Sequence, residues 1–368
     1  MSGIEFNSRV GAMPPYPVAA TYAFDGDHPV AFGKGHRLVK LASNETPWGP
    51  PAAVVGALQG QLETLNRYPD PAKSLLRGRI ADRTGLPMER IAVGNGSCEL
   101  LLCAGEALLE PGAELVYAWP SFSMYPHLAP ASGAREVRVP LDAEGRHDLV
   151  AMAHEVTAAT RLVIVCNPNN PTATALPVAE IDAFLASLPR HVAVILDEAY
   201  VEFSTLQDPD DTVDLVRRHP NLVVLRTFSK VYGLCGLRAG YALGSESFRS
   251  AVDRVRQPFS VNALAQVAAA EAIRHQDEVE RRVEQNIVER IHVTEELAER
   301  GLPCSESEAN FCWVDLGDRR EDVIVSGLAE RGVIVRAGEA LGGEGRLRVT
   351  FGSRHENDAF LNALDQLL

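Results

Sequence analysis

Short runs of apolar residues separated by longer mixed stretches dominate the first two thirds of the chain. Four of these runs are almost uninterrupted, at positions 114–118 (ELVYA), 161–166 (RLVIVC), 192–196 (VAVIL) and 222–225 (LVVL). Strands covered on both faces have this pattern, because neither side meets water. The stretches between them have helical patterns, so we predict crossover helices and a largely parallel sheet.

The pattern changes after Asn262. An alanine-rich helix is predicted over residues 263–275, and a long helix follows it. The long helix carries one apolar stripe with a four-residue spacing, formed by Val279, Val283, Ile287 and Ile291. Strands at 309–314, 333–336 and 347–351 and a helix at 322–330 come next. This alternation predicts a smaller α+β domain.

These patterns divide the chain into three parts. Residues 1–45 are rich in Pro, Gly and His, which favours an extended arm that packs with the small domain or with a partner subunit. Residues 46–260 form the predicted large α/β domain and residues 261–368 the small domain. The fold class is therefore α/β, with helices flanking a mainly parallel central sheet.

Charge and cysteine content narrow the classes of function. The net charge of -14 disfavours binding to nucleic acid and to anionic membranes. No apolar run is long enough to span a bilayer, and the first residues lack the apolar core of a signal peptide. The six cysteines are scattered without zinc-ligand spacing. We expect a cytoplasmic protein with reduced thiols and no metal site.

Polar residues follow three of the predicted strands in succession. They lie at 167–172 (NPNNPT), 197–200 (DEAY) and 226–230 (RTFSK). Ligands of parallel sheets bind at the carboxyl ends of the strands, so these residues mark a candidate site.

The three blocks resemble those of fold-type I enzymes that use pyridoxal 5'-phosphate (PLP), and specifically the histidinol-phosphate aminotransferase branch of the class I/II aminotransferases. The resemblance covers almost the whole chain. Further matching blocks are 41–50 (LASNETPWGP), 66–70 (NRYPD), 94–99 (GNGSCE), 120–125 (PSFSMY), 226–240 (RTFSKVYGLCGLRAG) and 347–352 (LRVTFG). The resemblance implies a PLP-dependent transaminase with a large PLP-binding domain and a smaller α+β domain.

The resemblance implies roles that suit the residue types. Lys230 would be the Schiff-base lysine. Burial and the positive charge of Arg238 would both lower the pKa of Lys230. Asp197 holds the pyridine nitrogen in its protonated form. Tyr200 and Asn170 hydrogen-bond the phenolic oxygen of PLP. A surface lysine and a turn aspartate are the alternative interpretations of Lys230 and Asp197.

The cofactor phosphate would be held at the start of a predicted helix over residues 99–109. The resemblance assigns it Ser229 and Arg238, with backbone donors at Gly96, Ser97 and Cys98. A glycine-rich turn that opens a helix suits an anion, although such a turn is weak evidence by itself.

Two aromatic residues match positions that contact the cofactor. Phe122 would stack on the pyridine ring, with a core phenylalanine as the alternative interpretation. Tyr68 would reach the PLP phosphate of the other subunit, which predicts a homodimer with shared active sites.

Four residues match substrate-binding positions. Arg348 would hold glutamate or 2-oxoglutarate by a planar two-point contact, and also the phosphate of a phosphorylated substrate. Arg336 would bind a second anion. The alternative for both is a solvated arginine at a strand edge. Asn170 belongs to the same site. Tyr16 is a candidate contact for a substrate phosphate, and Tyr22 competes with it.

Three residues depart from the family pattern. Cys98 stands where aspartate is usual and Ala173 where glycine is usual. Thr46 and Ala173 favour the similar aromatic or phenylalanine aminotransferase subgroup.

We expect transamination of L-histidinol phosphate with 2-oxoglutarate in histidine biosynthesis, with aromatic amino acids as the alternative substrates. Two further hypotheses are an amino acid phosphate decarboxylase and a non-enzymatic binding protein.

Overall fold

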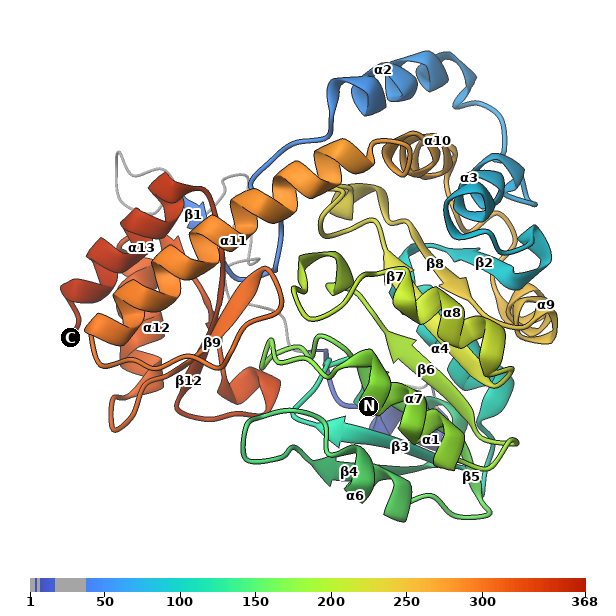
Figure 1. Ribbon diagram of the computed structural model, residues 1–368, viewed down its shortest axis with the longest axis horizontal. Coiled ribbons are helices and arrows are strands. Elements are labelled where there is room, and N and C mark those ends of the chain that lie inside the picture. Colours follow the sequence, from blue (N-terminus) through green and yellow to red (C-terminus); the bar gives the residue numbers. More distant parts are fainter. Residues whose placement is uncertain (1–3, 5–6, 17–37) are drawn as a thin grey trace.

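The centre of the larger part of the molecule is a seven-stranded sheet (Figure 1). A computed structural model describes residues 4, 7–16 and 38–368. The strand order is β2-β8-β7-β6-β5-β3-β4. The strands are β2 (Ile91–Gly94), β3 (Glu114–Trp119), β4 (Arg135–Pro140), β5 (Thr160–Cys166), β6 (Ala193–Asp197), β7 (Leu222–Thr227) and β8 (Gly240–Leu243). Neighbouring strands from β7 to β4 are parallel, and β8 is antiparallel to β2 and β7. The four predicted strands are confirmed as β3, β5, β6 and β7.

Both faces of this sheet are apolar because each strand alternates between two buried clusters. On β5, Val163 and Val165 join one cluster, while Leu162 and Ile164 join the other. Uninterrupted apolar runs are required for a strand that is covered on both sides.

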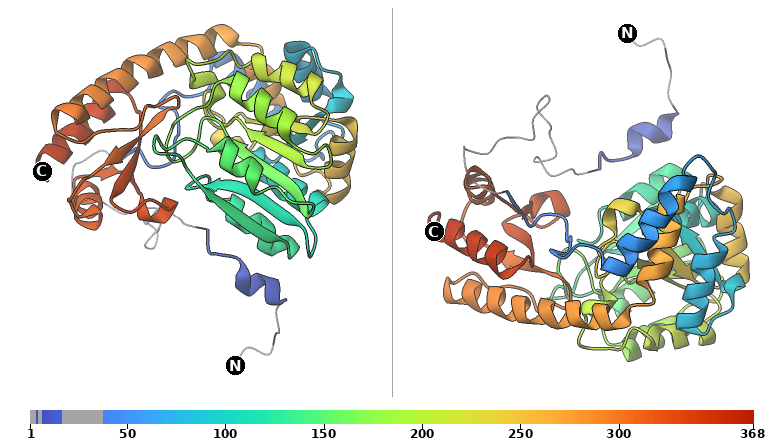
Figure 2. Two further views of the ribbon diagram at one scale, coloured as in Figure 1. Left: turned by 60° about the horizontal axis from the view of Figure 1, so that its bottom comes forward. Right: turned by 90° about the horizontal axis from the view of Figure 1, so that it is seen from above.

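Helices cover the two faces, as the two views in Figure 2 show. One cluster is completed by α4 (Gly96–Leu108), α5 (Tyr125–Ser132) and α9 (Glu246–Val255). The other is completed by α2 (Ala52–Gln61), α3 (Ser74–Thr84), α6 (Leu149–His154), α7 (Val178–Ser187), α8 (Asp211–Arg218) and α10 (Ala263–Ala272). The result is the three-layer α/β arrangement that the sequence predicted.

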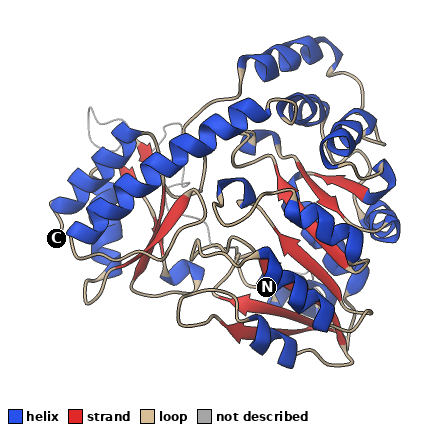
Figure 3. Cartoon of the chain, in the orientation of Figure 1, coloured by secondary structure: helices blue, strands red, loops and turns tan. Residues whose placement is uncertain are grey.

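A smaller part follows, with its strands and helices visible on the left of Figure 3. Its antiparallel sheet has the order β11-β12-β9, and a parallel pair joins β1 to β10. These strands are β1 (Val39–Lys40), β9 (Phe311–Asp315), β10 (Val333–Ile334), β11 (Arg336–Ala337) and β12 (Arg346–Thr350). The helices are α11 (Gln276–Glu299), α12 (Glu321–Glu330) and α13 (Arg354–Asp365). The strand predicted at 333–336 is in fact two short strands in different sheets.

The long helix α11 departs from the predicted stripe. Its buried residues are Val279, Arg282, Asn286, Val293 and Leu297, whereas Ile291 is 49% exposed. A strict four-residue spacing rotates by about 40° around a helix at every step, because one residue advances about 100°. The buried line therefore needs three-residue steps as well.

The N-terminal arm is not wholly extended. Residues Ser8–Ala12 form a short helix, α1, whose N-cap is Asn7. Arg9 Nη1 donates to the carbonyl of Ala131 at the end of α5, at 3.2 Å.

The predicted division at residues 45 and 260 stays a proposal, and α10 packs against α2 and α3 of the larger part. No helix within the described ranges is both long and apolar enough to cross a membrane.

Candidate active site

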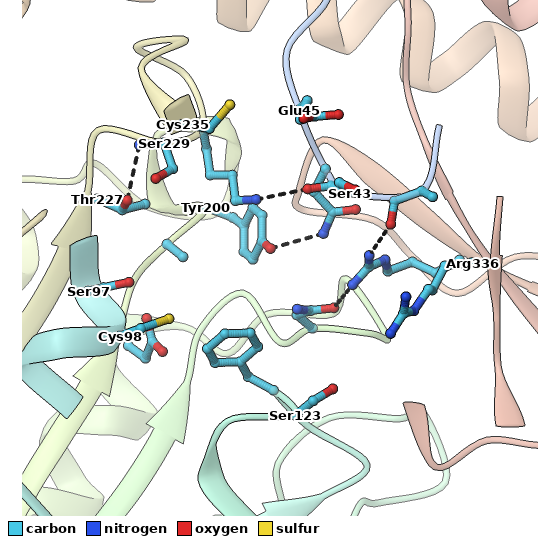
Figure 4. A pocket seen from close by; sticks show the side chains of 18 of the residues that line it. Ser43, Glu45, Ser97, Cys98, Ser123, Tyr200, Thr227, Ser229, Cys235 and Arg336 are labelled. Carbon is cyan, nitrogen blue, oxygen red and sulfur yellow. Dashed lines mark hydrogen bonds between the residues drawn. The ribbon is translucent and has the colours of Figure 1, made fainter. Parts of the chain in front are cut away.

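A cavity of about 470 Å³ lies where the carboxyl ends of β5, β6 and β7 face the smaller part. The segment after β1 and the strands β11 and β12 complete its walls. Figure 4 shows Ser97 and Cys98 on one side and Arg336 on the other. All the predicted site residues line this cavity except Gly96 and Tyr68.

Lys230 lies three residues beyond the end of β7. Its Nζ donates to the carbonyl of Ser43 at 3.1 Å and lies 5.5 Å from the centre of the Tyr200 ring. Burial lowers the pKa of Lys230 to about 8, and the positive charge of Arg348 contributes. A lysine with this pKa has an appreciable neutral fraction near pH 7.5, as a nucleophilic amine requires.

Asp197 ends β6 and is 3% exposed. Its Oδ2 accepts a hydrogen bond from the Tyr125 hydroxyl at 2.8 Å, while its Oδ1 is buried without a partner among the described residues. Burial raises the pKa of Asp197 to about 6, and the neighbouring charge of Glu198 raises it too, although Tyr125 opposes them. A buried carboxylate oxygen without a partner suits a cationic ring nitrogen. Tyr125 was missed, although its block was recognised in the sequence.

The start of α4 forms a cradle of backbone N–H groups beside Arg238. Gly96 has a φ of +74°, which side chains rarely adopt, and a Cβ there would lie 2.7 Å from Arg238 Nη2, so glycine is favoured at this position. Asn95, the N-cap of α4, makes no side-chain cap, which leaves the first backbone N–H groups available. Arg238 Nη1 lies 3.4 Å from the hydroxyl of Ser229. Gly96 therefore acts by allowing the close approach of Arg238.

Phe122 and Tyr200 come from two separate segments of the chain. Phe122 packs edge-on against Tyr125, with ring centres 5.7 Å apart. The buried Tyr200 hydroxyl accepts a hydrogen bond from Asn44 Nδ2 at 2.9 Å, and burial raises the pKa of Tyr200. Asn44 in turn bonds Thr350 on β12 through its backbone N–H at 2.9 Å. Sequence reasoning gave Asn44 no role, because its contacts depend on distant segments.

The two predicted substrate arginines lie side by side on paired strands. Arg336 and Arg348 are register partners of β11 and β12, 9% and 7% exposed. Arg348 donates to Asn170 Oδ1 and to the carbonyl of Ala42, both at 2.6 Å. Burial lowers the pKa of Arg348 to about 10, and the charge of Arg336 acts in the same direction. Two buried neighbouring cations would suit an anion.

The other predicted tyrosines and Cys98 differ in where they lie relative to the cavity. Tyr16 lines the cavity, with its ring 6.0 Å from that of His127. Tyr22 lies outside the described residues. Tyr68 is 82% exposed, stacks on Phe259 and does not reach this cavity. Burial raises the pKa of Cys98, which keeps its thiol neutral.

Ala173, the other departure in a cofactor block, is fully buried in the loop after β5. It adopts a φ of +63°. Its backbone bonds to Asn169 and Glu308, each at 2.8 Å, hold it there. The loop therefore keeps a conformation that glycine adopts more readily.

Comparisons with known proteins agree with this geometry. Residues 36–364 match the sequence model of the family described as aminotransferase class I and II. An aromatic amino acid aminotransferase from Streptomyces coelicolor is 40% identical over 98% of this chain and 97% of its own length. A histidinol-phosphate aminotransferase from Geobacillus thermodenitrificans is 42% identical over 90% of each chain. The structure of histidinol-phosphate aminotransferase from Sinorhizobium meliloti in complex with PLP has a TM-score of 0.83 at 28% identity, covering 90% of this chain and 92% of that one.

Proposed function

The chain belongs to the class I and II aminotransferase family and is a PLP-dependent aminotransferase, and we propose that it transfers the amino group of L-histidinol phosphate to 2-oxoglutarate. The observation that carries this proposal is the buried pair Arg336 and Arg348. Histidinol phosphate has a phosphate and no carboxylate, while 2-oxoglutarate has two carboxylates. Two adjacent cations suit both substrates, whereas an aromatic amino acid brings only one carboxylate.

The cavity fits the cofactor on its own geometry. The partnerless Oδ1 of Asp197 suits a protonated ring nitrogen, and the cradle at Gly96 suits a phosphate. We assign Ser97, Ser229 and Arg238 to that phosphate. Tyr200 and Asn170 are assigned to the phenolic oxygen and Phe122 to the ring face. Bound PLP supplies a conjugated ring that withdraws electrons from the substrate α-carbon.

The remaining chemistry belongs to the side chains. Lys230 Nζ would attach the cofactor and, once a substrate amine has displaced it, would carry the proton from the amine-bearing carbon of the substrate to the cofactor carbon C4′, to which Lys230 had been bonded. Asp197 maintains the positive charge on the ring nitrogen throughout. Arg348 and Arg336 orient the substrate by its anionic groups, with Tyr16 beside them. We further propose a homodimer in which Tyr68 reaches the cofactor phosphate of the partner subunit.

Aromatic amino acids are the second candidate donors, because relatives of similar identity are named aromatic amino acid aminotransferases. The test compares kcat/KM for L-histidinol phosphate and L-phenylalanine with 2-oxoglutarate as acceptor. We expect at least a tenfold preference for histidinol phosphate. Arg336→Met should reduce the histidinol phosphate value by about 100-fold, because a buried charge pair to phosphate is lost, and the phenylalanine value much less. A preference for phenylalanine in the unmodified enzyme would reassign the substrate.

A further inference from the structure

A second cavity, of about 350 Å³, lies between the start of α3, the strand β2 and the end of α9. It shares no lining residue with the active-site cavity. Four cationic residues line it, Lys73, Arg77, Arg249 and Arg256, against the single carboxylate of Asp253. This concentration of positive charge is unexpected in a chain with a net charge of -14, and it favours anions.

Lys73 is the residue that most needs an anion. It is 3% exposed, and its ammonium makes no hydrogen bond or ion pair with any residue that the structure describes. Burial lowers the pKa of Lys73 to about 8, and Arg256 and Arg77 add to that effect. Asp253 and Glu99 act in the opposite direction, but neither is close enough to pair with it. Lys73 lines the cavity, and its ammonium has no partner among the described residues, so a bound anion would offset the cost of holding this charge on a largely buried side chain.

The nearby carboxylates are already engaged. Asp70 receives the backbone N–H groups of Ala72 and Ser74 at 2.9 and 2.7 Å, so it caps α3. Glu99 accepts from the backbone of Asn95 at 2.7 Å and from Ser260 at 3.1 Å. Neither carboxylate forms an ion pair with Lys73, although both act on it electrostatically.

The arginines are fixed in place with donors to spare. Asp253 is shared by Arg249, at 2.6 Å, and Arg256. Arg249 Nε and Arg77 Nη2 also donate to backbone carbonyls, those of Glu89 and Met88. Within the described chain, Arg249 Nη2, Arg256 Nε and Arg77 Nε make no hydrogen bond. One carboxylate among four cations leaves a net positive charge.

We propose that this second cavity binds a phosphate group, either as the free ion or as the end of a small phosphate monoester, with Lys73 as its central ligand. A doubly charged tetrahedral oxyanion can accept from the ammonium and from guanidinium groups on different sides at once. The cavity also lies behind the cofactor cradle. Ile91 and Val93 of β2 line it, and this strand leads directly to Gly96. An anion bound here stabilises the strand that carries the cradle.

The test uses the holoenzyme, in which the active-site phosphate position is filled. The chain has only four lysines, Lys34, Lys40, Lys73 and Lys230. Acetylation of each is followed by peptide mass spectrometry in chloride, inorganic phosphate or glycerol phosphate at equal ionic strength. We expect phosphate or its monoester to slow acetylation of Lys73 at least fivefold, with an added lysine-containing peptide as the internal reference. The more potent of the two compounds identifies the source of the phosphate group.

Two variants give an independent measurement. Phosphate should raise the Tm of the wild-type holoenzyme above its value in chloride, and Lys73→Met should lose at least half of that increase. Arg254→Gln, which removes an exposed charge from the same helix α9, should keep it. Equal acetylation of Lys73 in all three salts, or a Tm increase unchanged by Lys73→Met, would overturn the proposal. A second copy of the chain that closes the cavity would give these same contrary results.

Discussion

Burial changes the acid–base chemistry of single residues at both ends of the active-site cavity. It lowers the pKa of Lys230 to about 8 and raises that of Asp197 to about 6. At a pH between about 6 and about 8, Lys230 begins to lose its proton while Asp197 is ionised. Both groups are therefore in the state that cofactor binding needs at mildly alkaline pH.

The capture of PLP by the cofactor-free enzyme should follow the titration of Lys230. The neutral amine is the reactive form, so the rate should rise with pH, reach half its maximum near pH 8, and then level off. Stopped-flow absorbance at a series of pH values measures this. Arg348→Gln should move the midpoint upward, because it removes a positive neighbour. A wild-type midpoint at the ordinary lysine value of about 10.4 would contradict the account.

The hydrogen bond from Tyr125 should control how well Asp197 holds the cofactor. Tyr125→Phe removes a bond to a charged group, worth about 1.5 kcal/mol, so the Kd for PLP should rise roughly tenfold. Equilibrium titration by absorbance measures the Kd. Tyr117→Phe is the matched control, because its hydroxyl bonds Glu136 outside the cavity at 2.5 Å. Equal Kd values in the two variants would show that Tyr125 has no such role.

Sequence patterns identified the residues that carry charge but not those that position them. Lys230, Asp197, Arg348 and Arg336 follow or lie on recognisable strands, and the cavity unites them. Asn44 and Tyr125 act through partners 156 and 72 positions away in the chain. Such contacts depend on packing between distant segments, which local patterns do not contain.

At the scale of elements, α11 connects the two parts of the molecule and contacts the loop that carries Lys230. Arg282 on this helix is 1% exposed. It donates to the carbonyls of Val231 at 2.9 Å and Gly49 at 2.7 Å, and to Glu278 at 2.7 Å. These bonds fix the loop after Lys230 and the segment after β1 to one helix.

Loss of the Arg282 side-chain charge should destabilise the protein substantially. Arg282→Met leaves the buried carbonyl of Val231 and the partly buried carbonyl of Gly49 without this donor, so the free energy of unfolding should fall by about 2–4 kcal/mol. Urea unfolding measures it. Arg281→Met is the matched control, since Arg281 pairs with the same Glu278 but is half exposed, and it should cost no more than about 0.5 kcal/mol. Similar losses in both variants would refute the role given to Arg282.

Elements were predicted best where their apolar runs were long. The central strands β3, β5, β6 and β7 were found for this reason. The two-residue strands β1 and β10 were not separable from loops, because pairing with a distant segment defines them. The predicted apolar stripe on α11 assumed a uniform four-residue spacing, whereas the buried residues of this helix are not evenly spaced.

At the scale of the whole molecule, the active site requires both parts of the chain. The large sheet supplies Lys230 and Asp197, and the smaller part supplies Arg336 and Arg348. The doubly covered sheet was predictable from composition along the chain. The meeting of the two parts around one cavity came only from the family resemblance, because no local pattern encodes it.

The exposed Tyr68 leads to a prediction about assembly. If it serves the partner's cofactor, the particle in solution should have about twice the chain mass of 39.9 kDa. Sedimentation equilibrium measures this mass. Tyr68→Phe should weaken PLP binding several-fold without changing the mass, because only one hydrogen bond is lost. A monomer with full PLP affinity would contradict the shared site.

The most direct test locates the cofactor on the chain. The holoenzyme is reduced with borohydride to make the attachment permanent, digested, and analysed by mass spectrometry. The account predicts that the peptide containing Lys230 carries the added mass of the reduced cofactor, and that Lys230→Ala carries none. Added mass on the peptide of Lys34, Lys40 or Lys73, or no added mass at all, would contradict it.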